Sequence, residues 1–118
     1  MNDAFRNRRG SLHCESVSLD LLARRHGTPL WVYSGGAIRG AVAEVREAFA
    51  AHRPLICYSM KANSSLAILR LMVAEGCGIE VVSGGELFRA LRAGAHPDRI
   101  VFSGVGKTDD EIRARIGA

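Results

Sequence analysis

Short apolar runs alternate with longer stretches of helical periodicity along most of the chain. The apolar runs predict strands at residues 30–33, 54–60, 79–82 and 100–102. Helices are expected at residues 19–25, 37–51, 66–73, 86–93 and 109–116, with Ser18 and either Ser64 or Ser65 as capping residues. Strands and helices that alternate with short links are typical of an α/β fold with a parallel sheet.

The number of expected elements limits the architecture. The chain has 118 residues and about four expected strands, whereas an eight-stranded β/α barrel typically needs about 250 residues. We therefore expect either a small open sheet or a partial (β/α) TIM-type barrel. Residues 1–17 are expected to form an N-terminal tail with a possible short strand, loose over the Arg-rich residues 1–10, and residues 18–118 to form the barrel portion.

The strand expected at residues 54–60 leads directly into Lys61, one of only two lysines in the chain. Because successive strand side chains face opposite ways, one face would carry Ile56, Tyr58 and Met60, and the other Cys57, Ser59 and Lys61. A lysine that is partly desolvated at the mouth of a barrel suits Schiff-base chemistry, since desolvation frees the neutral amine. The alternative is a lysine whose stem packs on the protein while its head stays in water.

Composition narrows the class of protein. The chain is 47% hydrophobic and 24% charged with a net charge of +4, and its arginines are dispersed among few aromatic residues, which argues against nucleic-acid binding. No apolar run approaches the roughly 18 residues that span a membrane, and no signal-peptide pattern opens the chain. Three cysteines without a CxxC pair fit a reducing compartment, so a cytoplasmic location is expected.

Two glycine-containing segments suggest ligand binding. Gly106-Lys107-Thr108 resembles the end of a phosphate-binding loop, but Val101 stands where the pattern requires a glycine, so Thr108 is more simply a helix cap. The segment at 83–86 (SGGE) could bring backbone close to a ligand, or could be a tight turn with positive φ. The four histidines are far apart and show no metal-ligand spacing.

Four segments together resemble the N-terminal part of the fold-type III pyridoxal-phosphate decarboxylases, and most closely the diaminopimelate decarboxylase group. They are GTPLWVYS at 27–34, ICYSMKANSSLAILRLM at 56–72, GCGIEVVSGGELFRAL at 76–91 and HPDRIVFSGVGKTDDEI at 96–112. They follow the order and spacing of that family. The resemblance implies the N-terminal portion of an alanine racemase-like barrel that binds pyridoxal 5'-phosphate.

The resemblance also implies roles for individual residues. Lys61 would hold the cofactor covalently, and Glu80, at a position more often filled by aspartate, would face the cofactor pocket. Glu86 matches a carboxylate at a helix start near the site, although simple helix capping would also explain it. The family's phosphate loop, cofactor-stacking histidine, substrate-binding residues and C-terminal β-domain have no counterpart here, so an N-terminal fragment is expected.

Three functions remain open at this stage. The first is a carboxy-lyase that converts meso-diaminopimelate to L-lysine and carbon dioxide, with a homodimer expected for the complete protein. The second is decarboxylation of another diamino acid on the same fold. The third is a folded remnant or interaction module without catalytic activity.

Overall fold

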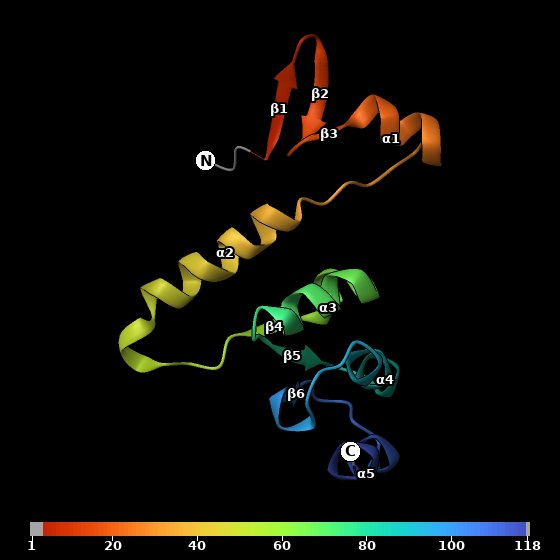
Figure 1. The fold of residues 1–118 in the computed structure, drawn as a ribbon. Helices are drawn as coiled ribbons and strands as arrows, with labels where there is room; N and C mark the ends of the chain where they lie inside the picture. Colours follow the sequence, from red (N-terminus) through yellow and green to blue (C-terminus); the bar gives the residue numbers. More distant parts are fainter. Residues whose placement is uncertain (1–3, 118) are drawn as a thin grey trace. The chain divides into compact units, whose positions relative to one another are not determined.

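The computed structural model describes residues 4–117, and the chain divides into two compact units between Val45 and Arg46. Figure 1 labels the helices and strands of both units along the chain. Each unit has its own sheet, antiparallel in the first and parallel in the second. The expected alternation of strands and helices is found in the second unit.

The first unit begins with a three-stranded antiparallel sheet in the order β1-β2-β3. Its strands are β1 (Phe5–Arg8), β2 (Ser11–Cys14) and β3 (Val17–Ser18). Arg9 and Gly10 join β1 to β2 with φ of 52° and 81°, a backbone conformation that two-residue hairpins require. The loose tail expected over residues 1–10 is therefore wrong for residues 5–8, while residues 1–3 lie outside the described residues.

Two helices follow in the first unit. In α1 (Leu19–His26) the Ser18 side chain accepts a hydrogen bond from the Leu21 amide, which confirms Ser18 as the cap. The strand expected at residues 30–33 is wrong, because that segment is irregular and pairs with no strand among the described residues. Helix α2 (Gly35–Ala48) starts two residues earlier than expected, and a short 3₁₀ turn, η1 (Ala50–His52), follows it.

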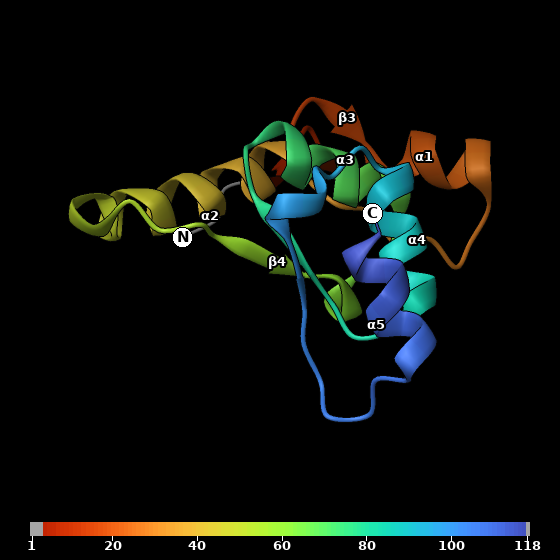
Figure 2. The same cartoon turned by 90° about the horizontal axis from the view of Figure 1, so that it is seen from below.

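The second unit contains a parallel sheet in the order β4-β5-β6. The strands are β4 (Cys57–Ser59), β5 (Gly78–Val81) and β6 (Ile100–Phe102). Helices α3 (Leu66–Ala74), α4 (Gly84–Arg92) and α5 (Asp109–Ile116) follow these strands in turn, and α4 and α5 lie side by side in Figure 2. The described part of this unit also contains η1 and two further 3₁₀ turns, η2 (Met60–Ala62) and η3 (Pro97–Arg99). The predicted βα units and parallel pairing are confirmed, with three strands instead of about four.

The two faces of the parallel sheet differ in burial. Ile79 and Val81 are fully buried on β5, and helices α3 and α4 pack against this strand with buried Leu69 and Leu87. Glu80 lies between them in the sequence and points to the opposite face, since side chains alternate along a strand. Apolar burial at about 25 cal/mol per Å² therefore holds the helices on one face and leaves the other face for polar side chains.

Candidate active site at the carboxyl ends of the parallel strands

Lys61 lies immediately after β4, in the 3₁₀ turn η2. The strand ends at Ser59, two residues before the lysine, so the expected strand over residues 54–60 is too long at both ends. The side chain of Met60 is fully buried while Lys61 is exposed, and η2 contacts β5. The exposure of Lys61 is compatible with both interpretations of this lysine, and its role stays a prediction.

Glu80 occupies the central strand β5 and is held by two serine hydroxyls. Ser59 pairs with Glu80 in the β4–β5 register, and its Oγ donates a hydrogen bond to Glu80 Oε2. Ser103, directly after β6, donates from its Oγ to Glu80 Oε1. The prediction that Ser59 and Glu80 share a face of the sheet is confirmed. One carboxylate thus joins the carboxyl ends of three neighbouring strands.

Electrostatics keeps the Glu80 carboxylate ionised. The hydrogen bonds from Ser103 and Ser59 lower the pKa of Glu80 below its usual value, and the positive charge of Lys61 lowers that pKa further against an opposing effect of burial. Lys61, just after β4, and Glu80, on β5, therefore place an amine and a carboxylate at the carboxyl ends of the parallel strands, where ligands bind in parallel α/β folds.

Ser103 is the residue of this cluster that sequence reasoning missed. A signal for it existed in the register: Val101 pairs with Glu80, and Ser103 comes two residues later on the same face. Consecutive βα units already place β6 beside β5, but Ser103 lies beyond the end of the strand, so local patterns do not show that its hydroxyl reaches Glu80.

The segment at 83–86 forms the start of helix α4. Ser83 Oγ accepts from the Glu86 amide at 3.2 Å, and Glu86 Oε2 accepts from the Val82 amide at 2.8 Å. Gly84 and Gly85 belong to the first helical turn without positive φ, so the tight-turn alternative is wrong. Glu86 serves as a helix-capping carboxylate here.

The phosphate-loop resemblance at 106–108 is explained by a capping box. Thr108 Oγ1 accepts from the Glu111 amide at 3.3 Å, and Glu111 Oε2 accepts from the Thr108 amide at 3.0 Å. The other oxygen, Oε1, accepts from the Gly84 amide at 2.8 Å. Since a carboxylate already occupies both helix starts, these amides are not free for a phosphate.

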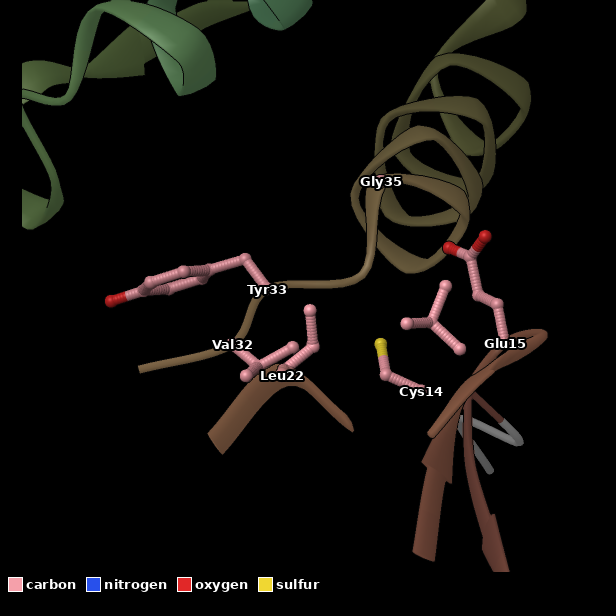
Figure 3. A pocket seen from close by; sticks show the side chains of 7 residues that line it. Cys14, Glu15, Leu22, Val32, Tyr33 and Gly35 are labelled. Atoms are coloured by element: carbon pink, nitrogen blue, oxygen red, sulfur yellow. The ribbon is translucent and has the colours of Figure 1, made fainter. Parts of the chain in front are cut away.

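A separate pocket lies in the first unit, where Cys14, Leu22, Val32 and Tyr33 line it together with Glu15 (Figure 3). The Glu15 carboxylate accepts hydrogen bonds from Ser34 Oγ at 2.7 Å and from the Gly36 amide at 2.8 Å, and these bonds lower its pKa. Glu15 therefore caps helix α2. The remaining lining is largely apolar, so the pocket offers no cluster of reactive groups.

The fold and the amine–carboxylate pair define a class of protein. Residues 36–116 match the family described as pyridoxal-dependent decarboxylase, pyridoxal binding domain, and the chain belongs to this family. It is similar to the diaminopimelate decarboxylase of Pseudomonas fluorescens, with 45% identity over 94% of this chain and 27% of that protein. The chain thus spans about a quarter of the length of the curated relatives it matches.

Solved structures agree with the family. A protein from Aquifex aeolicus superposes with a TM-score of 0.92 at 43% identity, covering 98% of this chain and 29% of the other. Diaminopimelate decarboxylase from M. jannaschii, solved in complex with L-lysine, gives a TM-score of 0.92 at 37% identity over 98% of this chain and 28% of that chain. The fold is therefore the N-terminal portion of an alanine racemase-like β/α barrel.

Other kinds of site find little support in residues 4–117. None of the helices there combines the length and the apolar character needed to cross a membrane. No group of three or more His, Cys, Asp or Glu side chains in that part of the chain could hold a metal ion. Cys14, Cys57 and Cys77 are free thiols, and burial raises the pKa of Cys57 and Cys77.

The residues present fit pyridoxal phosphate in part. An exposed primary amine can reach an aldehyde, and an ionised carboxylate on the same sheet edge can balance positive charge on a bound ring or amine. The helix starts of α4 and α5, which would suit a phosphate, are paired with Glu111. The described residues therefore provide the covalent anchor and an anion, and the phosphate would be bound by other groups.

Proposed function

We propose that this chain carries the cofactor-anchoring lysine of an amino-acid decarboxylase that converts meso-diaminopimelate to L-lysine and carbon dioxide. The observation that supports the proposal is Lys61, exposed at the carboxyl end of β4 and electrostatically coupled to Glu80, within a pyridoxal-binding domain. The similarity to diaminopimelate decarboxylases over 94% of the chain favours this substrate.

Each residue has a separate task in this proposal. Lys61 would hold the cofactor through its amine, which suits covalent attachment to an aldehyde. Bound pyridoxal phosphate supplies an electron sink for the electron pair left when carbon dioxide departs. Glu80 presents a fixed negative charge that favours positively charged nitrogen near the sheet edge.

The remaining inferences concern the complete protein. L-lysine, present in the M. jannaschii complex, would be the product of the proposed reaction. We infer a homodimer from the family resemblance and a cytoplasmic location from the free thiols. Residues 18–118 are proposed to belong to the barrel and residues 1–17 to precede it.

Lys61 is the expected attachment point, and a trapping experiment tests it. The complete gene product is incubated with pyridoxal phosphate, reduced with borohydride and mapped by peptide mass spectrometry. Label is expected on Lys61 and lost in Lys61→Ala. Lys107→Ala is the matched control, because Lys107 donates to the Gly104 carbonyl at 2.5 Å and lies 5.5 Å from the Phe102 ring. Label mainly on Lys107 would contradict the assignment.

The substrate is tested separately by carbon dioxide release from meso-diaminopimelate, ornithine and arginine. Turnover of meso-diaminopimelate alone is expected. Turnover only of another diamino acid would favour the second function, while labelled Lys61 without any turnover would favour a module that has lost catalysis.

A further inference from the structure

Residues on or directly after three adjacent strands meet at one carboxylate, at the carboxyl ends of the parallel strands. Ser59 ends β4, Glu80 lies on β5 and Ser103 follows β6. Each hydroxyl donates to a different oxygen of Glu80, so both oxygens are occupied. The backbone supports the arrangement, since Ser59 is paired with Glu80 and the Ser103 amide donates to the Val81 carbonyl at 2.9 Å.

We propose that Ser59 and Ser103 are positioning residues that fix Glu80 as a permanent anion for Lys61, and that Glu80 therefore does not act as the proton acceptor of this lysine. The inference rests on the proposed function, because it assigns roles around the same amine. The inference adds Ser59 and Ser103 to the site. It also assigns Glu80 the role of a fixed anion in place of that of a proton acceptor.

The hydrogen-bond donors and acceptors around Glu80 support its role as an anion. A serine hydroxyl has one proton to donate, and an ionised carboxylate can only accept. Both serines donate to Glu80 while it is ionised. Protonation of Glu80 would reverse one of these bonds, because the carboxyl O–H would then donate to a serine, and the charge-assisted character of both bonds would be lost. A carboxylate stabilised in this way is a weak base, whereas an efficient proton acceptor has a pKa near the working pH.

Few charged or titratable side chains lie around Glu80. Lys61 on η2 lowers the pKa of Glu80, and the Cys57 thiol on β4 interacts with the same carboxylate, which contributes to the raised pKa of that thiol. Arg99 on η3 also acts on Cys57. Among these groups Lys61 is the cation that acts on Glu80 itself.

The first experiment measures the titration of Glu80 in the complete gene product. Carbon-13 labelling of glutamate carboxyls, with the Glu80 resonance assigned by its loss in Glu80→Gln, gives the pKa by NMR. Glu80 is expected to titrate below the usual range of glutamate, and to move upward in Ser59→Ala and in Ser103→Ala. Ser103→Thr, which keeps a hydroxyl, should restore the low value. Ser64→Ala is the matched control, since Ser64 is exposed and accepts both of its hydrogen bonds from Arg89 through the backbone carbonyl.

The second experiment tests whether the serines act through Glu80. The rate at which Lys61 captures added pyridoxal phosphate is followed by absorbance across pH. Ser59→Ala and Ser103→Ala are each expected to slow capture by about three- to tenfold, as loss of one charge-assisted hydrogen bond would. In a Glu80→Gln background the same substitutions should have no further effect, because the carboxylate they hold is gone.

The outcomes separate this inference from the proposed function. If neither wild type nor Ser64→Ala captures the cofactor at Lys61, the proposed function fails, while the NMR titration still reports on the serines. If capture occurs at Lys61 but the pKa of Glu80 does not respond to either serine, the inference is overturned. It is equally overturned if Glu80 titrates near neutral pH, since that result describes a proton acceptor.

Discussion

Gly78, at the start of β5, shows how tightly the parallel sheet is built at the level of single atoms. A Cβ added at Gly78 would lie 2.5 Å from the Arg99 carbonyl oxygen and 2.8 Å from Cys57 Sγ. The first atom belongs to the backbone next to β6 and cannot turn away as a flexible side chain can. Glycine is thus required at this position by space, without any need for positive φ.

Gly78→Ala is therefore expected to destabilise the protein by about 1–3 kcal/mol, as overpacking of a rigid site does. Gly40→Ala is the control, because nothing lies within 4 Å of an added Cβ in the middle of α2. Alanine there should stabilise by about 0.5–1 kcal/mol through helix propensity. Urea unfolding midpoints of the two variants test this, and equal midpoints would show that the close approach at Gly78 can relax.

Single residues of the site were predicted to different degrees. Lys61 and Glu80 were found because each follows or lies in a clear apolar run and matches a motif, and their chemical roles stay predictions until they are tested. The sequence reasoning placed Lys61 at the end of a strand over residues 54–60. The strand instead ends at Ser59, and Met60 is buried in the 3₁₀ turn that also contains Lys61. Ser103 was missed since it lies beyond the end of β6 and its contact with Glu80 depends on the direction of its side chain, which local patterns do not contain.

At the level of elements, arginine side chains on the helices donate hydrogen bonds to backbone carbonyl groups of neighbouring segments. Arg115 Nη2 on α5 donates to the Pro97 and Ile100 carbonyls, both at 2.9 Å, and Arg89 on α4 donates twice to the Ser64 carbonyl at 3.0 and 2.6 Å. A planar guanidinium can donate two bonds in a fixed geometry, which an ammonium cannot. This use of arginine gives a structural reason for the scarcity of lysine in the chain.

Glu111 links two helices in a similar way, since its oxygens accept from Gly84 at the start of α4 and from Thr108 at the start of α5. These bonds lower the pKa of Glu111 below its ordinary value of 4.5. A carboxyl with a lowered folded-state pKa stabilises the fold above its unfolded-state pKa, and this contribution is lost as the pH falls through the folded-state value.

Glu111→Gln is expected to lower the thermal midpoint at pH 7 and to flatten its decline at acidic pH. Glutamine has a single acceptor oxygen, so one of the two helix starts would lose its partner. Asp109→Asn removes the same charge from the same helical turn of α5 and is the control. A control that changes the acid profile as much as Glu111→Gln would show that the helix dipole, and not the bonds of Glu111, is responsible.

The elements that were predicted well have local causes. Helices α1, α4 and α5 carry capping side chains at Ser18, Ser83 and Thr108, which interact within a few residues. The strand expected at 30–33 was wrong because an apolar run becomes a strand only when another strand pairs with it. A strand within residues 1–17 was expected as one possibility, but β1 could not be located because all of its side chains are exposed and polar patterns predict no strand.

At the level of the whole molecule, the parallel sheet has one covered face and two edges. Strands β4 and β6 lie at the ends of the order β4-β5-β6 among the described residues. On the face that carries Glu80, the side chains of Val82 and Val101 remain 40% and 45% exposed. Strand edges and exposed apolar side chains together favour association with other chains.

The 118-residue chain on its own is therefore expected to associate and to lack decarboxylase turnover. Unpaired edges favour oligomers or aggregates, and catalysis needs a water-excluded site with several groups that bind the phosphate. Light scattering after size exclusion should show species larger than a monomer. Val101→Lys, which places a charge on the edge strand β6, should reduce this association. The contrary result would be a monodisperse 118-residue monomer with a sharp unfolding transition and with turnover of meso-diaminopimelate near that of complete family members. It would show that this portion of the barrel is sufficient for folding and catalysis.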